Sequence, residues 1–276
     1  YLLGGVLFCV LLGDLGRIPL GSNLFINLLD IAVALYIASV IRPILLHKEP
    51  LVRTYFMWTI FIFTIMVASL LLRTGSLPVK ELMIAGLYPL RWALYALIPL
   101  GVVITVLSQA LSQTHLLNWF HKTFVYLALL GFLQLIFFPN LGIIQQFGFD
   151  PHYFRLVGTW LDPNFIGPAF ILGILILEST LPNSNRKYVL IFALFLALLA
   201  TFSRSSYLGF AIAGLMYALF QRSWKKGLIV LGAIIVLYLS FAIPRQNLEK
   251  SRNIDRVVSA GSRLQSYSQG IQLFES

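Results

Sequence analysis

The amino-acid sequence predicts an all-α protein, a polytopic transmembrane helix bundle of about nine spans. Hydrophobic residues make up 59% of the 276 residues, charged residues only 11%, and the mean hydropathy is +0.86. Such a composition indicates an integral membrane protein rather than a soluble domain with a large core. The apolar runs approach the roughly 20 residues that a ~30 Å hydrocarbon layer requires, and they lack the period-two alternation of strands.

The expected spans follow the apolar runs along the chain. They lie near residues 1–13, 23–41, 54–72, 86–108, 119–138, 163–181, 187–203, 205–220 and 227–243. Turn formers such as Gly75-Ser76 and Pro182-Asn183 separate them. The first run is too short to cross ~30 Å. The chain also begins without Met and stops inside a polar segment, so we expect a fragment that lacks residues at both ends.

Lysines and arginines are divided unequally between alternate loops, and this predicts the orientation. The richer set, expected to be cytoplasmic, holds Arg42, Lys48, Arg53, Lys122, Arg186, Lys187, Arg222, Lys225 and Lys226. The poorer set, expected to face outward, holds Arg17, Arg73, Lys80, Arg155 and Arg204. Topology and contact with anionic membrane lipids therefore explain the net charge of +10, and nucleic acid is not an expected partner.

Metal and nucleophile chemistry find no support in the sequence. Cys9 is the single cysteine, so it can form neither a disulfide framework nor a Cys/His metal site. An Asp-x-Asp pair, a Walker loop and a Gly-x-Ser-x-Gly elbow are also missing from the sequence. We expect no metal and no cofactor.

Arg155 is the first of several arginines that point to an anion. An ionised side chain at membrane depth costs roughly 2.5–3.5 kcal/mol even on lenient insertion scales, so its default interpretation is functional. A guanidinium stays charged and can fork onto two phosphate oxygens. Asp162-Pro163-Asn164 follows at the expected N-terminus of a helix, where Asp or Asn caps free N–H groups. Alternatively, Arg155 snorkels to the interface and Asp162 merely caps.

Arg204 lies in Ser203-Arg204-Ser205-Ser206, which interrupts an apolar stretch and predicts a tight hairpin or a broken helix. Irregular backbone at membrane depth survives where it lines protein or water. The alternative is an ordinary hairpin tip with a snorkelling arginine.

Arg91 and Asp30 also lie inside apolar runs. Pro89 marks a kink or a helix start, which would place Arg91 one turn from the outer face. Asp30 could pair with such an arginine, and a structural salt bridge is favoured over catalysis. His152 lies three residues before Arg155, where a solvated loop histidine is favoured over a substrate contact.

Four segments occur in a defined order between the spans. The first two are Leu87-Tyr-Pro-Leu-Arg91-Trp92-x-x-Tyr95 and Arg155-x-x-Gly158-Thr-x-x-x-Pro163-Asn164-x-x-Gly167. The others are Thr201-x-Ser203-Arg204-Ser-x-x-x-Gly209 and Ser262-Arg263-x-x-x-Tyr267-x-x-Gly270-Ile-x-Leu-Phe274. Together they cover most of residues 85–276 and resemble the O-antigen ligase and O-antigen polymerase superfamily.

The resemblance implies a multi-pass protein of the bacterial inner (plasma) membrane, related in fold to C-type glycosyltransferases. Members transfer or polymerise glycans carried on undecaprenyl diphosphate, outside the cytoplasm and without a metal, to build lipopolysaccharide and other surface polysaccharides. The expected partners are the lipid-linked glycan, a glycan acceptor and membrane lipids. Ligase versus polymerase, the glycan and the acceptor stay open.

By motif, the resemblance assigns the lipid diphosphate to Arg155 and Arg204, with Arg91 contributed by an earlier span. Arg263 would add to this clamp or meet the acceptor. The supporting residues would be Asp162, Asn164 and Ser203.

The family's proposed catalytic histidine lies later in the large outer loop, beyond Ser276. The resemblance therefore assigns no general base within residues 1–276 and implies that this piece alone is inactive. Two alternatives remain: an anion transporter, since some superfamily members have been named bicarbonate transporters, and an assembly protein whose arginines only set topology.

Residues 1–244 are expected to form the bundle and residues 245–276 the start of the large extracytoplasmic loop. The tail has apolar residues at Leu264, Tyr267, Ile271 and Phe274. Their spacing of three and four predicts an amphipathic helix, which would place Arg263 toward the cavity or simply cover the bundle.

Overall fold

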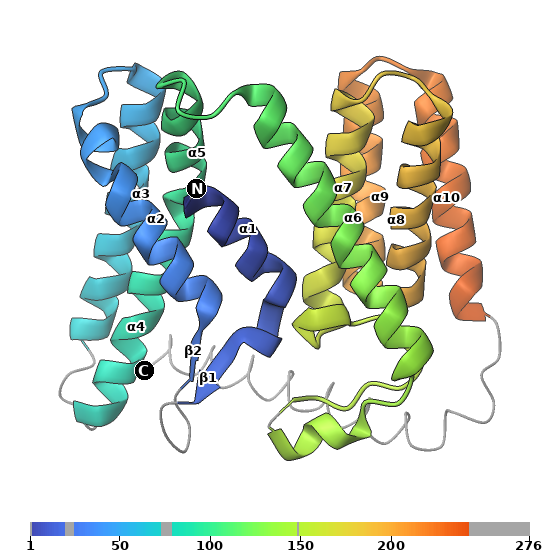
Figure 1. Cartoon of the computed structure of the whole chain (residues 1–276), viewed down its shortest axis with the longest axis horizontal. Coiled ribbons are helices and arrows are strands. Elements are labelled where there is room, and N and C mark those ends of the chain that lie inside the picture. Colours follow the sequence, from blue (N-terminus) through green and yellow to red (C-terminus); the bar gives the residue numbers. More distant parts are fainter. Residues whose placement is uncertain (1, 20–24, 73–78, 148, 243–276) are drawn as a thin grey trace.

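The computed structural model describes residues 2–19, 25–72, 79–147 and 149–242. The predicted amphipathic helix at 262–274, Arg263 and the boundary at 244 lie outside these residues. The described part is mostly helical, and helices run up and down between two ends of the molecule (Figure 1).

The N-terminal half begins with a short helix and a hairpin. It contains α1 (Leu2–Leu12), the 3₁₀ turn η1 (Gly13–Gly16), β1 (Arg17–Pro19), β2 (Phe25–Asn27), α2 (Leu28–Leu46), α3 (Pro50–Leu71), α4 (Val79–Ala96) and α5 (Ile98–Leu107). β1 and β2 pair antiparallel, with Ile18 opposite Ile26, and this short hairpin is an addition to the predicted all-α fold.

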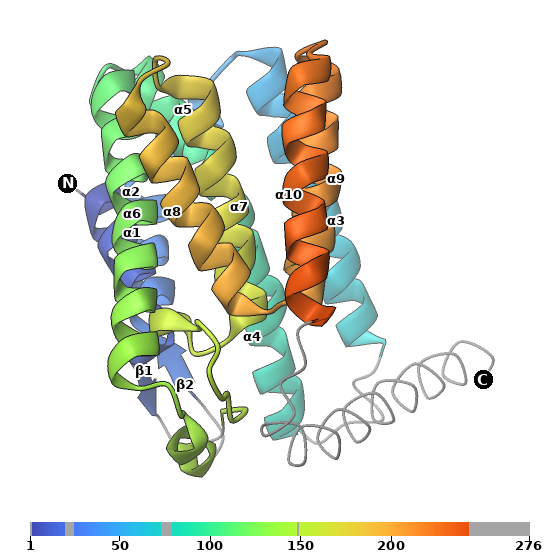
Figure 2. The same ribbon diagram turned by 90° about the vertical axis from the view of Figure 1, so that its right-hand side faces the viewer.

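The C-terminal half is a set of helices joined by short turns and one longer loop. It contains α6 (Gln113–Phe137), the 3₁₀ turns η2 (Gly142–Phe147) and η3 (Gly158–Trp160), α7 (Pro163–Thr180), α8 (Asn185–Thr201), α9 (Arg204–Phe220) and α10 (Trp224–Ala242). Figure 2 shows α9 and α10 side by side, and both pack within this half.

Two boundaries differ from the predictions for physical reasons. The span expected at 23–41 is a helix at 28–46, because Asn27 and Asp30 form a capping box that starts α2. Pro89 lies inside α4 rather than at its start, and the break comes at Leu97, before the Pro99 of α5. Arg91 is therefore about three turns into α4 instead of one.

Two apolar cores hold the halves together. The N-terminal core joins α1, α2 and α5, with Val33 fully buried, and it reaches Leu116 at the start of α6. The C-terminal core joins α6 to α9, with Leu127 and Phe170 fully buried. α1 and α6 lie between the two groups of helices (Figure 1).

Five helical segments of the described chain are long and apolar enough to cross a membrane. They are Leu28–Leu46, Pro50–Leu71, Glu81–Leu107, Gln113–Phe137 and Pro163–Thr180. The α4–α5 pair thus acts as one span broken at Leu97. α8 and α9 have 17 residues each and α1 has 11, so the count of about nine spans stays a prediction.

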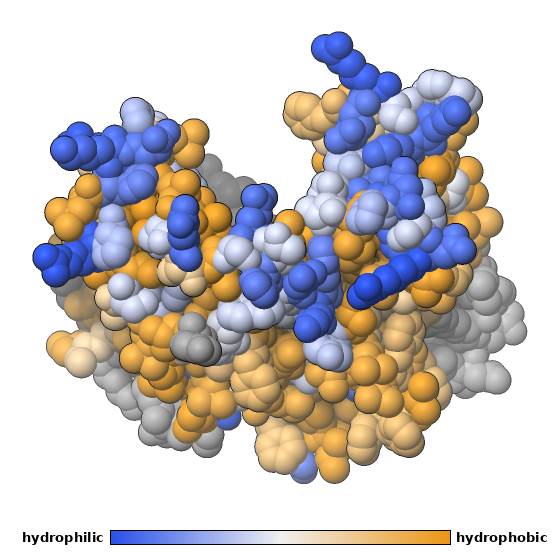
Figure 3. All heavy atoms as spheres, turned by 45° about the horizontal axis from the view of Figure 1, so that its top comes forward, coloured by the Kyte–Doolittle hydropathy of each residue, from blue (hydrophilic) through white to orange (hydrophobic). Residues whose placement is uncertain are grey.

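Figure 3 shows hydrophilic residues gathered on the face that carries the α2–α3, α7–α8 and α9–α10 connections.

Candidate functional site

The N-termini of α7 and α9 meet at the end of the C-terminal half opposite the α7–α8 and α9–α10 connections (Figure 1). Asp162 caps α7 by accepting a hydrogen bond from the Asn164 N–H at 2.7 Å, with Pro163 in the first turn. Ser203 caps α9, which begins at Arg204. The predicted helix start and the predicted break at Ser203 are both confirmed.

Gly167 permits this meeting because the two helices touch there. A Cβ on Gly167 would overlap the Ser206 Oγ, and Ser206 is almost completely buried. Only a residue without a side chain allows the backbone of α7 to approach α9 so closely. The sequence offered Gly167 as a motif glycine but not as this contact.

A small hydroxyl–amide network ties the two helix starts together. Ser203 Oγ donates to Asn164 Oδ1 at 2.8 Å, and Ser205 Oγ donates to the same oxygen at 3.3 Å. Ser206 Oγ donates to Ser203 Oγ at 2.8 Å. The predicted supporting residues Asn164 and Ser203 are therefore direct partners. Two helix N-termini side by side direct partial positive charge toward one place.

Arg155 holds the end of α8. Its Nε donates to the Thr201 carbonyl oxygen at 2.9 Å, and its Nη2 donates to the Phe202 carbonyl oxygen at 3.1 Å. Phe202 has a left-handed backbone, with φ at 48°, so the turn needs outside support. Arg155 thereby fixes the residue that lies two positions before the exposed Arg204.

Gln134 fixes the backbone around Arg155, and the sequence analysis missed it. Its Oε1 accepts from the Val157 N–H at 2.9 Å and the Gly158 N–H at 3.1 Å. Gly158 has φ at +54°, which glycine adopts without strain. An available signal was that Gln134 is the one polar side chain between residues 127 and 138 of an apolar run.

His152 is only 9% exposed, so its interpretation as a solvated loop residue is wrong. Burial lowers the pKa of His152 below its ordinary 6.5, and the charge of Arg155 lowers it further. The carboxylates of Asp162 and Asp150 act in the opposite direction. His152 therefore titrates within the electrostatic field of the Arg155 loop.

Arg91 lies in the other half of the molecule and pairs with Asp30. Arg91 Nε is 2.8 Å from Asp30 Oδ1, and the Tyr95 hydroxyl donates to the same oxygen at 2.8 Å. The favoured structural salt bridge is thus present. The assignment of Arg91 to the diphosphate stays a prediction, and α4 and α9 lie in different helix groups (Figure 1).

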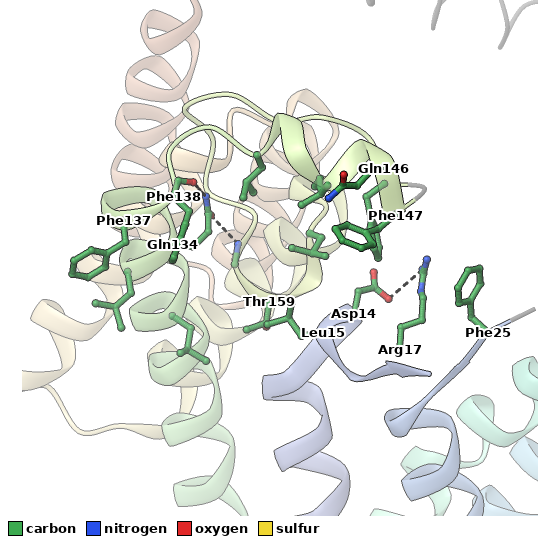
Figure 4. A pocket seen from close by; sticks show the side chains of 17 residues that line it. Asp14, Leu15, Arg17, Phe25, Gln134, Phe137, Phe138, Gln146, Phe147 and Thr159 are labelled. Carbon is green, nitrogen blue, oxygen red and sulfur yellow. Dashed lines mark hydrogen bonds and ion pairs between the residues drawn. The ribbon is translucent and has the colours of Figure 1, made fainter. Parts of the chain in front are cut away.

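A cavity of about 1030 Å³ lies beside the loop that carries Gly158 and Thr159. Its apolar wall includes phenylalanines from several segments, and Arg17 lies over the rings of Phe25 and Phe149 with centroid distances of 5.2 and 4.5 Å. Arg17 Nη2 is 3.4 Å from Asp14 Oδ1 at the rim (Figure 4). Thr159 Oγ1 is buried and has no hydrogen-bond partner within the described residues. The cavity could hold an apolar chain with a polar end.

The structure therefore brings Arg155, Arg204, Asp162, Asn164 and Ser203 together and places Arg91 elsewhere. Across residues 2–242, apart from the gaps stated above, no group of three or more His, Cys, Asp or Glu side chains could hold a metal ion.

Residues 189–276 match the protein-family model described as O-Antigen ligase. The match starts in α8 and includes Ser203 and Arg204. No curated protein and no solved structure matches the chain.

Proposed function

Starting from the membership of the O-antigen ligase family that the match over residues 189–276 supports, we propose a transfer reaction for this membrane protein. It moves a glycan from undecaprenyl diphosphate to an acceptor on the outer side of the bacterial inner membrane, during surface polysaccharide biosynthesis. The proposal needs no metal and no cofactor.

The observation that carries the proposal is the junction of α7, α8 and α9. Two capped helix starts lie side by side there, joined through Ser203 and Asn164. Arg204 is exposed at the first position of α9. A helix N-terminus with an adjacent arginine is a suitable site for phosphate oxygens.

The proposed chemistry is displacement at the anomeric carbon of the donor sugar. An acceptor hydroxyl forms the new glycosidic bond, and the bond between that carbon and the diphosphate oxygen breaks. The electron pair leaves with undecaprenyl diphosphate, whose growing negative charge Arg204 and the two helix starts stabilise. Fixed positive groups that meet developing charge commonly supply the largest catalytic contribution. The hydroxyl proton passes to a general base, which we assign to no residue within 1–276.

In this scheme Arg155 mainly positions the turn that presents Arg204. Its described hydrogen bonds go to the carbonyl oxygens of Thr201 and Phe202, so it holds the turn that presents Arg204. Lysine cannot reproduce this bond pattern, because it lacks the planar fork of donors.

The 1030 Å³ cavity fits the lipid part of the donor. Its apolar wall would take the first isoprene units, while the diphosphate lies toward the Gly158–Asp162 loop that begins α7. No observation favours the alternative of an anion transporter.

Complementation of a null strain by the full-length gene tests the proposal. Arg204→Ala is expected to abolish display of the polymeric glycan while the protein reaches the membrane at a normal level. Lys122→Ala, which changes an exposed cation at the opposite end of the bundle, is the matched control and should leave display unchanged. Normal display with Arg204→Ala would remove this junction from the mechanism.

A further inference from the structure

α3 is the most exposed of the five span-length helices. Only 6% of its apolar stretch is buried, against 44% for α7. Its exposed side chains include Met57, Trp58 and Phe61. In a membrane protein such a face contacts lipid or another protein. The charged and apolar side chains on the face indicate which of the two it binds.

Two cations without acidic partners among the described residues lie at the start of α3. Lys48 lies just before the helix and Arg53 in its first turn, and both are exposed. Glu49 lies between them in the sequence, yet no ion pair joins a carboxylate of the described chain to Lys48 or Arg53. The charge at this end of α3 is thus available to an outside anion.

The two cations border a hollow of about 680 Å³ whose wall continues down α3. Thr54, Met57, Trp58 and Phe61 line it together with Lys48 and Arg53. Spacings of three and four residues place these positions on one helix face. Trp58 and Phe61 are in edge-to-face contact, with ring centroids 5.6 Å apart, which makes the apolar wall continuous.

We propose that this hollow binds an anionic phospholipid. The phosphate lies between Lys48 and Arg53, and the upper part of an acyl chain lies along Met57, Trp58 and Phe61. The order of the two parts agrees with a lipid, since the cations are at the helix end and the apolar residues are one to three turns deeper. Two cationic residues at the level of the head groups should raise the affinity for an anionic lipid about 30-fold. This equals about 2 kcal/mol, at 1.4 kcal/mol per tenfold.

This site is independent of the proposed glycan transfer. It lies at the end of the bundle that the lysine and arginine distribution predicts to be cytoplasmic, where anionic lipids give the membrane its negative surface potential. The α7–α9 junction is at the opposite end (Figure 1).

Native mass spectrometry of the whole chain in detergent tests the proposal, with phosphatidylglycerol and phosphatidylcholine of equal chain length as probes. The chain should retain phosphatidylglycerol more tightly, and the double variant Lys48→Gln, Arg53→Gln should lower that affinity about 30-fold. Binding of phosphatidylcholine should stay the same. Lys48→Gln alone changes a residue outside every helix, so its expected smaller loss does not depend on folding of the double variant.

Lys122→Gln is the matched control, because it removes another exposed cation near the same end of the bundle. Trp58→Ser should weaken both lipids, since it removes apolar wall. Equal affinity for the two lipids, or an equal loss with Lys122→Gln, would overturn the proposal. Binding of inorganic phosphate as tight as that of the lipid would also overturn it. So would a dimer in light scattering that Trp58→Ser dissociates, because the α3 face would then bind a second copy.

Discussion

Two arginines in this molecule, one inside a span-length helical segment and one in a loop between two such segments, have opposite surroundings. Arg91 in α4 is 2.8 Å from the carboxylate of Asp30, which compensates its charge within its own half. Arg155 instead donates to carbonyl oxygens at the end of α8. The first arrangement makes a local neutral pair, and the second uses one cation to shape a turn that presents another, Arg204.

The difference shows how to separate a structural arginine from a functional one. A side chain that a neighbouring carboxylate neutralises contributes little to the attraction of an anion. Arg155 offsets the partial negative charge of the carbonyl groups at the end of α8, so the starts of α7 and α9 keep their partial positive charge. On this basis the α7–α9 junction is the stronger anion site, although Asp162 lowers its net charge.

The largest expected effect is a loss of stability when the contact between Gly167 of α7 and Ser206 of α9 is disturbed. Gly167→Ala places a methyl group onto the Ser206 Oγ, and such overpacking costs about 1–3 kcal/mol. A lower melting temperature of the purified protein in detergent measures it. Gly209→Ala is the control, because a Cβ there meets only Ile171 at 3.5 Å. Equal melting temperatures for the two variants would show that α7 and α9 are not in close contact.

Arg155→Lys is expected to lower transfer by about tenfold or more. Lysine cannot span both carbonyl oxygens, and a buried acceptor left unpaired costs about 1–3 kcal/mol. Because Arg155 acts through the turn that presents Arg204, Arg155→Lys should add little to the loss that Arg204→Ala causes by itself. A further large loss in the double variant would instead make Arg155 a direct ligand of the diphosphate.

Asp30→Asn should have a smaller effect, and it should be on stability rather than transfer. It removes the partner of Arg91 and weakens the bond from Tyr95. Arg91 is about half exposed, with 54% of its side chain accessible, so the loss should be about 1 kcal/mol or less. Melting curves and transfer assays on one preparation separate the two readouts. A larger loss of transfer than that of Arg155→Lys would reverse the comparison between the two arginines.

The smallest effect is a pH dependence from His152. Its pKa is lowered in the folded chain by burial and by Arg155, so the unfolded chain binds the proton first as the pH falls. Stability from the neutral ring is therefore full above about 6.5 and declines as the pH drops from there through the lower, folded pKa. Melting curves between pH 7.5 and 5.5 should show this decline, and His152→Gln should remove it. Replacement of the exposed His115 by Gln is the control. A decline that persists in His152→Gln would assign it to another group.

The sequence predicted the features that local chemistry determines. Apolar runs located the helices, Asp162-Pro163 marked the start of α7, and the serines around Arg204 marked the break between α8 and α9. The Asp30–Arg91 pair was also anticipated, because two opposite charges inside apolar spans have few other partners.

The sequence could not predict contacts that depend on how helices meet. Gln134 supports the Arg155 loop from α6, more than twenty positions away, and Gly167 faces Ser206 only because α7 and α9 pack there. The left-handed Phe202 has no local signal, since glycine is the usual residue in that conformation. The start of α2 was missed for a different reason: Asn27 and Asp30 have the local spacing of a capping box, but the apolar Phe25 and Ile26 before them pair in β2 and extended the apolar run.

Binding of a short-chain prenyl diphosphate to the full-length protein tests the central claim most directly, with Arg204→Ala and Arg91→Gln measured side by side. Removing a charged donor that meets the phosphate should cost about 1.5–3 kcal/mol, or roughly 10- to 150-fold in affinity. We expect this loss for Arg204→Ala and a change of less than about threefold for Arg91→Gln, since Asp30 already neutralises Arg91. Unchanged binding by Arg204→Ala, together with a large loss for Arg91→Gln, would place the diphosphate in the N-terminal half and contradict the account.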